Sequence, residues 1–213
     1  MTDPARSPET VEALIAHAHR FAALGLSPGG SGNLSIRLQD TVMITPTGSA
    51  LARLASEQLS VLRLADGDLL SGPAPSKEAP IHLGVYRNRP DVHGIVHLHS
   101  PAATAVSCLP VRDREQADLP PFTPYQVMRF ADLPVAPYAR PGTADLADGV
   151  VERLREPGRS AVLMAHHGSV VVGGSITKAA DLAEELESAA QVALLLRGTG
   201  AAPLPTQAVH ALR

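Results

Sequence analysis

Strand-like and helix-like segments alternate along the chain, and this alternation restricts the possible folds more than any other feature of the sequence. Apolar residues recur at helical spacing in four segments, 8–24, 78–89, 143–155 and 178–197. Strand patterns occupy five further segments, 34–38, 42–45, 93–99, 161–165 and 170–172. The turn pair Gln39-Asp40 joins the first two strands, and Asp66-Gly67 predicts a second hairpin within 59–70. We therefore expect one α/β domain over residues 1–213, with a mixed sheet that has helices on both faces.

Short hydroxyl residues predict where several helices begin. Ser7, Thr143 and Thr177 precede three of the helical segments, and each side chain can accept a hydrogen bond from the first helical turn. Ser100-Pro101 predicts the start of a further helix directly after the strand 93–99.

Residues 109–142 are rich in proline and lack clear periodicity. We expect this segment to be irregular, with short strands near 127–130 and 133–136. It also contains Tyr125, one of only 3 tyrosines in the chain, whose hydroxyl could donate a proton or simply pack.

The composition indicates a globular protein that acts neither on nucleic acids nor within a membrane. Of the 213 residues, 45% are hydrophobic and 18% are charged, which does not fit a disordered chain. The net charge is -3 without a basic run, and the apolar stretches fall short of the roughly 20 residues that a membrane helix needs. The N-terminal residues lack an apolar signal core. The single cysteine, Cys108, cannot form an intrachain disulfide, which suits a reducing compartment, so we expect the protein to be cytoplasmic. Cys108 shows no sign of activation, and we expect it to be a buried small residue.

Two histidines stand two residues apart in the strand 93–99. Alternate side chains of a strand point to the same face, so His97 and His99 would face one point in space. Such a pair can hold a zinc ion at the usual ligand distance of about 2.0–2.1 Å. Packed or surface histidines in a strand give the same pattern, and we expect His93, at the strand start, to be structural.

A second histidine cluster, His166-His167-Gly168, follows the strand 161–165. A catalytic zinc ion takes three protein ligands and keeps one position open for substrate. The first pair and one residue of the second cluster would supply these three ligands. Adjacent residues point in different directions, so we expect only one of His166 and His167 to bind.

Glu78 lies about 20 residues before the histidine pair, where a loop leads into a helix. Its carboxylate could be a fourth ligand that substrate displaces, or a general acid or base beside the metal. An ordinary acidic residue in a first helical turn is the alternative, because the helix dipole favours it there.

Three loops are rich in glycine and hydroxyl residues, at 29–33, 45–48 and 76–77. Glycines allow backbone N–H groups to approach a phosphate, and hydroxyls and an ammonium group add further donors. These loops match neither a Walker sequence nor a dinucleotide fingerprint, so we expect an anion site that is not a nucleotide site.

Taken together, these motifs resemble the class II aldolase/adducin family over roughly residues 10–200. The motifs that carry the resemblance are Gly32-Asn33 with Ser35, Thr45-Pro46-Thr47-Gly48, Pro75-Ser76 before Glu78, His97-x-His99 and His167-Gly168. The resemblance implies a three-layer α/β/α fold with a central, largely antiparallel sheet. It also implies a homotetramer with active sites at the subunit interfaces.

The resemblance further assigns the site residues. It implies that His97, His99 and His167 hold Zn2+, with Mn2+, Co2+ or Fe2+ as alternatives that imidazole ligands accept. Glu78 would transfer a proton. The residues implied to bind a substrate phosphate are Gly32, Asn33, Thr47, Gly48 and Ser76.

Within the family, the chain is most similar to members that decarboxylate 3-oxo-tetronate 4-phosphate to dihydroxyacetone phosphate. Lys77 stands where sugar-phosphate aldolases usually carry a small hydroxyl residue, and it would suit a substrate with a carboxylate. The similarity also covers 119–128, which contains Tyr125, so Lys77, Glu78 and Tyr125 are the expected catalytic residues. A metal-stabilised enediolate would hold the electrons that carbon dioxide leaves behind.

Two other functions stay open at this point. Aldol cleavage leaves the same enediolate, so an aldolase acting on a ketose phosphate such as L-fuculose 1-phosphate, or a ribulose-phosphate 4-epimerase, is the first alternative. A non-catalytic adducin-like module is the second. Adducin-type domains lack the metal ligands, whereas His97, His99, His167 and Glu78 are all present here.

Overall fold

The computed structural model describes residues 8–112 and 115–213. In this part of the chain one sheet contains the strands β1 (Asn33–Leu38), β2 (Thr41–Ile44), β3 (Ser60–Arg63), β4 (Leu69–Ser71), β5 (Gly94–Leu98), β6 (Val135–Ala136), β7 (Ala161–Met164) and β8 (Gly168–Gly173). Their order in the sheet is β4-β3-β2-β1-β5-β8-β7-β6. Neighbouring strands are antiparallel except β6 and β7, which run parallel. The expected mixed, largely antiparallel sheet is therefore confirmed.

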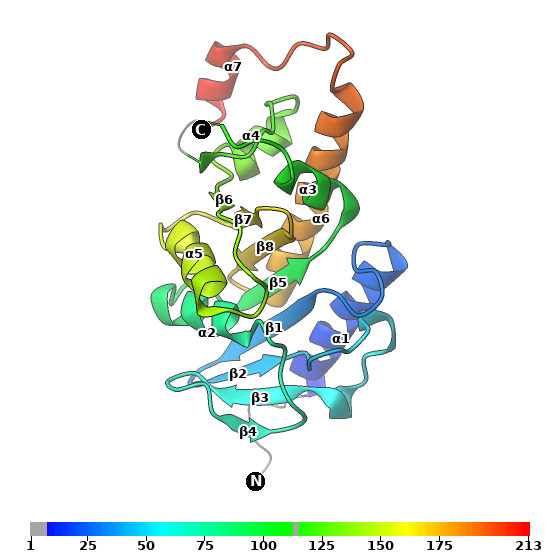
Figure 1. Cartoon of the computed structure of the whole chain (residues 1–213), viewed down its shortest axis with the longest axis vertical. Helices are drawn as coiled ribbons and strands as arrows, with labels where there is room; N and C mark the ends of the chain where they lie inside the picture. The colour runs from blue at the N-terminus through cyan, green and yellow to red at the C-terminus, as the bar shows by residue number, and fades with distance from the viewer. Residues whose placement is uncertain (1–7, 113–114) are drawn as a thin grey trace.

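Helices cover both faces of this sheet (Figure 1). The described helices are α1 (Pro8–Ala23), α2 (Ala79–Asn88), α3 (Pro101–Ser107), α4 (Pro124–Phe130), α5 (Ala144–Leu154), α6 (Ile176–Leu196) and α7 (Thr206–Ala211), with short 3-10 turns η2 (Leu51–Arg53) and η3 (Ser56–Gln58). α2 and α5 pack together on one face, and α1, α3 and α6 lie on the other. The three-layer α/β/α fold is confirmed. Among the described helices, none is both long and apolar enough to cross a membrane.

The central strand β5 divides the apolar core into two halves. Val96 and Leu98 belong to the apolar cluster under α1, α3 and α6, whereas Ile95 belongs to the cluster under α2 and α5. Because side chains alternate along a strand, His97 points to the same face as Ile95. The strand therefore presents its histidine toward the layer that contains α2.

Most predicted elements are present. Both hairpins form, with β1 and β2 joined at Gln39-Asp40 and β3 and β4 joined across Gly67. Thr143 caps α5, since its side chain accepts a hydrogen bond from the backbone N–H of Leu146. The predicted cap at Ser7 lies outside the described residues.

Residues 127–130 form the second half of α4, so the strand predicted there is wrong. The Thr123 side chain accepts a hydrogen bond from the backbone N–H of Gln126, and Pro124 occupies the first helical position. This local start signal outweighs the β-forming tendency of the short apolar run that follows it. The strand predicted near 133–136 is present in shortened form as β6.

Two predictions about single residues are also wrong. Ser175, rather than Thr177, caps α6: its backbone is extended, with φ -157° and ψ 164°, and its side chain accepts from the N–H of Lys178. Cys108 is exposed rather than buried, because it follows the last residue of the short helix α3, where the chain leaves the core.

Candidate active site

His97 lies in β5 at the centre of the sheet and is fully buried. Its Nδ1 lies 2.8 Å from the backbone carbonyl of Ser169, which can only accept, so Nδ1–H donates and Nε2 keeps its lone pair. That Nε2 lies 3.0 Å from Nε2 of His99. Two imidazole nitrogens this close need a shared cation or proton between them. The side chains of His97 and His99 therefore converge on one point, as the sequence predicts.

His167 completes a cluster of three imidazoles. Its ring centroid lies 5.1 Å from that of His97 and 4.8 Å from that of His99. One ring nitrogen from each of the three histidines lies within 4.8 Å of the others, which suits a single metal ion. In the described part of the chain, the buried Nδ1 of His167 has no hydrogen-bond partner. The donor set fits the zinc-type centre that the sequence predicts.

Two of the imidazoles, those of His99 and His167, are held in the neutral form that metal binding requires. Burial, together with the charges of His97 and His167, lowers the pKa of His99 to about 4. Burial and the charge of His97 also lower the pKa of His167. Both shifts favour the neutral imidazole, in which one ring nitrogen has a lone pair free for a cation.

Two glycines allow the loops of the site to touch the end of β5. A Cβ atom on Gly32, where φ is +78°, would lie 2.9 Å from the carbonyl oxygen of His97. A Cβ atom on Gly168 would lie 2.3 Å from the carbonyl oxygen of Leu98. Any larger residue at either position would push a loop away from the histidines, which explains glycine in both motifs.

Glu78 lies directly before α2 and faces the histidine cluster. Its Oε2 is 3.1 Å from Nε2 of His97, and its Oε1 is 3.3 Å from Nε2 of His167. Asn33 Nδ2 donates a hydrogen bond of 2.8 Å to Oε2. Burial would raise the pKa of Glu78, but hydrogen bonds and charge from His97, with the Asn33 bond and the charge of His167, hold this pKa well below its ordinary value. The carboxylate is thus ionised and can ligate a cation or move a proton.

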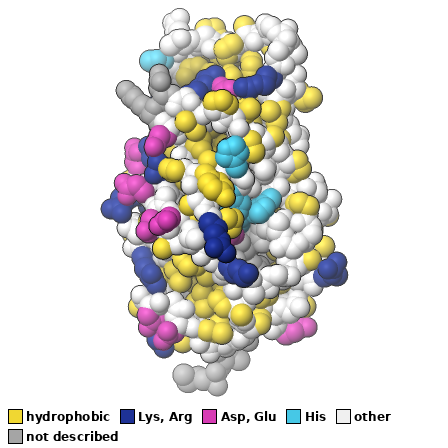
Figure 2. Space-filling model, viewed as in Figure 1, with side chains coloured by type: hydrophobic (Ala, Val, Ile, Leu, Met, Phe, Trp, Pro, Cys, Tyr) yellow, Lys and Arg dark blue, Asp and Glu magenta, His cyan; other side chains and the backbone are white. Residues whose placement is uncertain are grey.

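A cleft of about 570 Å3 opens beside these residues. The five predicted phosphate-binding residues all line it, together with Lys77, Glu78, His99 and His167. The loops at its rim are tied together by a bridge between Pro46 and Pro75. In Figure 2, histidine side chains gather in the middle of the face viewed, next to basic side chains. The cleft therefore combines the candidate metal centre with a basic, donor-rich rim.

The structure gives Asn33 partners that the sequence does not predict. Its Nδ2 donates to Glu78, and its Oδ1 lies 2.5 Å from Nε2 of the buried His82. Sequence reasoning missed His82 because a histidine within an amphipathic helix gives no sign of what it contacts. Its position four residues after Glu78, one helical turn further on, is the only signal available.

Two tyrosines differ in their relation to the cleft. Tyr125, a predicted catalytic residue, lies on α4 with 66% of its surface exposed and borders a groove against α6, so one chain alone does not bring it to the histidines. Tyr138, which sequence reasoning did not assign to the site, lines the cleft. Its ring centroid lies 6.4 Å from that of His166, which also lines the cleft and has a left-handed backbone with φ 57°.

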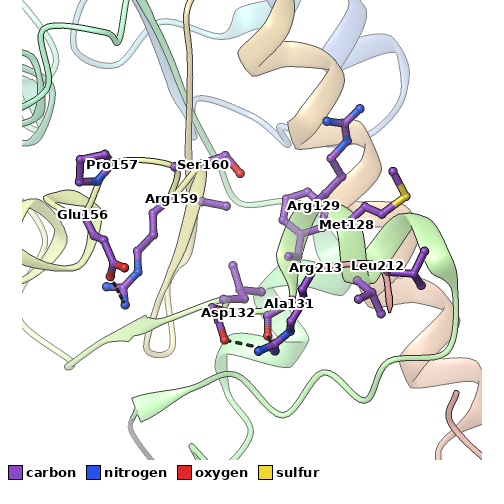
Figure 3. Close-up of a pocket in the computed structure, with 15 residues that line it drawn as sticks. Met128, Arg129, Ala131, Asp132, Glu156, Pro157, Arg159, Ser160, Leu212 and Arg213 are labelled. Carbon is purple, nitrogen blue, oxygen red and sulfur yellow. Dashed lines mark hydrogen bonds and ion pairs between the residues drawn. The ribbon is translucent and has the colours of Figure 1, made fainter. Parts of the chain in front are cut away.

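A second cavity, of about 320 Å3, lies near the C-terminus and is rich in arginine (Figure 3). Arg159 pairs with Glu156 at 2.8 Å, and Arg213 lies 3.4 Å from Asp132. Arg129 is 3.5 Å from a glutamate of α6. Each of these three arginines already faces a carboxylate. This cavity therefore lacks a basic rim like that of the cleft beside the histidines.

The fold and the site define a class of enzyme: a three-layer α/β/α protein with a three-histidine centre and a carboxylate at one end of the central strand. The sequence-family model named Class II Aldolase and Adducin N-terminal domain matches residues 12–194, and the chain belongs to this family. The family expected from the motifs is therefore confirmed.

Individual relatives agree with this assignment. The chain is 45% identical to a 3-oxo-tetronate 4-phosphate decarboxylase of Haemophilus influenzae, over 93% of this chain and 91% of that protein. It is 35% identical to an L-fuculose phosphate aldolase of Escherichia coli, over 80% of this chain and 76% of that protein. The crystal structure of YgbL from Klebsiella pneumoniae superposes with a TM-score of 0.90 at 38% identity, covering 97% of this chain and 98% of that one.

Proposed function

We propose that the chain is a metal-dependent lyase that decarboxylates 3-oxo-tetronate 4-phosphate to dihydroxyacetone phosphate. The observation that supports this most is the position of Lys77, which lines the same cleft as the three-histidine cluster and the glycine-rich loops. A substrate with a carboxylate at one end and a phosphate at the other needs two basic or donor-rich places on either side of the reacting ketone. The similarity to the Haemophilus influenzae decarboxylase supports the same substrate.

In this proposal His97, His99 and His167 hold the metal ion, which we take to be Zn2+, with Mn2+, Co2+ or Fe2+ as alternatives. When bound, the ion supplies Lewis-acid stabilisation of the negative charge that develops on the substrate oxygens. The backbone of the loops at Gly32 and Gly48, with the hydroxyls of neighbouring residues, would bind the phosphate.

Lys77 and Glu78 carry the remaining roles. The Lys77 ammonium group binds the substrate carboxylate and so distinguishes a sugar acid from a neutral ketose. Carbon dioxide leaves, and the bond pair stays on the substrate as an enediolate. Glu78, which takes up a proton from solvent, passes it to the carbon that lost carbon dioxide, and this gives dihydroxyacetone phosphate.

Tyr125 keeps a catalytic role in this proposal only if it reaches the cleft of a neighbouring subunit. We propose a homotetramer with active sites at subunit interfaces, and the exposed Tyr125 and Met128 on α4 support contact with a second chain. We also propose a cytoplasmic location, because an exposed, unpaired thiol at Cys108 suits a reducing compartment.

Aldol cleavage of a ketose phosphate is the second candidate, supported by the 35% identity to an L-fuculose phosphate aldolase. One experiment separates the two: dihydroxyacetone phosphate release is measured from 3-oxo-tetronate 4-phosphate and from L-fuculose 1-phosphate. We expect release with carbon dioxide from the first substrate, and at least about 10-fold weaker use of it by Lys77→Ser, which restores the hydroxyl of the aldolases. Release from L-fuculose 1-phosphate alone would contradict decarboxylation.

A further inference from the structure

A chain of buried hydrogen bonds leads from the interior of the protein to Glu78. The hydroxyl of Tyr86 lies 2.8 Å from Ser35 Oγ, and this oxygen lies 2.6 Å from Nδ1 of His82. Nε2 of His82 lies 2.5 Å from Asn33 Oδ1, and Asn33 Nδ2 lies 2.8 Å from Oε2 of Glu78. Apart from Glu78, all members of this chain are buried.

The amide of Asn33 fixes the direction of the hydrogen bonds between Ser35 and Glu78. Its nitrogen can only donate and faces Oε2 of Glu78, so its oxygen faces His82. That oxygen can only accept, so Nε2 of His82 carries the proton and Nδ1 accepts from Ser35. From Ser35 to Glu78, each donor therefore points toward Glu78, whereas the Tyr86 hydroxyl donates to the backbone carbonyl of Ser35.

The protonation state of His82 does not change near neutral pH. The side chain is fully buried in α2. Burial, with a smaller contribution from the charge of His97, lowers the pKa of His82 to about 3, although Glu78 acts in the opposite direction. The imidazole thus stays neutral and keeps a single proton for Asn33.

We infer that His82 is a positioning residue which, through Asn33, holds the carboxylate of Glu78 in the orientation that proton transfer requires. This inference rests on the proposed role of Glu78. His82 does not line the cleft, so it acts without touching substrate. A group that orients a reacting side chain in this way affects turnover rather than substrate binding.

The variants His82→Phe and His82→Gln separate orientation from packing. Phenylalanine fills a similar volume without a donor, whereas the glutamine amide nitrogen can replace Nε2–H. Val85→Ala is the matched control, because Val85 is buried on the same helix and belongs to the apolar core. The reaction measured is exchange of the carbon-bound protons of dihydroxyacetone phosphate with D2O, followed by 1H NMR. This step needs proton transfer but no decarboxylation, so it separates the inference from the choice of substrate.

We expect His82→Phe to lower kcat for exchange by about 10- to 100-fold with KM and metal content unchanged, and His82→Gln to recover most of the loss. Val85→Ala should exchange as the unaltered protein does. Crystal structures provide a readout without activity: the Asn33–Glu78 hydrogen bond should be lost in His82→Phe and kept in His82→Gln. Exchange within about twofold of normal in His82→Phe, or equal losses in both variants, would overturn the inference. An intact Asn33–Glu78 bond in His82→Phe would do the same.

Discussion

His97 is the side chain on which the candidate metal centre depends most. The carbonyl of Ser169 fixes its tautomer, and Glu78 and His99 both lie within about 3 Å of its Nε2. The sequence predicted the histidine pair because residues two apart in a strand share a face. It placed Glu78 beside the metal only as one of two alternatives and through the family resemblance, since the contact depends on how α2 packs against the sheet. The partners of Asn33 were missed for the same reason.

Glu78→Gln tests the role of the carboxylate. The amide has nearly the same shape, and the three histidines are untouched, so we expect the variant to keep its metal ion. It cannot exchange a proton, and turnover should fall by about 100-fold or more. Metal content by atomic emission and initial rates of product formation check this. Loss of the metal ion together with activity would instead assign Glu78 as a ligand.

The buried His82 predicts a pH dependence of stability. Its pKa is about 3 in the folded protein against 6.5 for an exposed histidine, so the unfolded chain binds the extra proton first as the pH falls. Stability is therefore lost between about pH 6.5 and pH 3, by about 2 kcal/mol from pH 7 to pH 5. Urea unfolding at both pH values, compared with His82→Gln, measures this contribution. An equal pH dependence in both proteins would contradict it.

Among the helices, α3 shows how a remote element can hold the candidate metal centre in place. It begins two residues after His99, and the buried carboxylate of Glu187 on α6 accepts hydrogen bonds of 2.8 Å from the backbone N–H groups of Ala102 and Ala103. A negative charge at this position satisfies two free donors and complements the helix dipole. The start of α3, and with it the end of β5, is thereby fixed to α6.

Glu187→Ala should therefore lower the free energy of unfolding by about 2–4 kcal/mol, because it leaves two buried N–H groups without partners. Glu187→Gln keeps one carbonyl oxygen as an acceptor and should lose about half as much. Urea unfolding of both variants beside Ser188→Ala, whose exposed side chain also lies on α6, checks the order. A loss in Glu187→Ala no larger than in Ser188→Ala would show that the contact adds little.

Periodicity predicted the long helices, because the apolar core selects those residues directly, and the turn pairs Gln39-Asp40 and Asp66-Gly67 predicted both hairpins. It failed where a local capping interaction decided the structure, as Thr123 does at α4 and Ser175 does at α6. It predicted no helix at α7, whose six residues leave no side chain buried. A segment that short, without a core-facing side, has no periodic pattern to detect.

In the molecule as a whole, the order of the strands builds the site. β5 lies between β1 and β8, so Asn33 is directly opposite His97, and Val170 is its partner on the other side. The histidines, Glu78 and the loops of the cleft come from segments far apart in the sequence. Hairpins and helix spacing do not determine how these strands are ordered. The sequence could therefore supply the residues of the site through family motifs, but not their contacts.

The most direct test of this account is metal removal and restoration. The protein is treated with a chelator, dialysed and supplied with Zn2+, and bound metal and dihydroxyacetone phosphate release are measured at each stage. We expect about one ion per chain, loss of release without metal and recovery on its return, whereas His97→Ala should neither bind zinc nor recover. Undiminished release from the metal-free protein, or from His97→Ala, would contradict a metal centre at the three histidines.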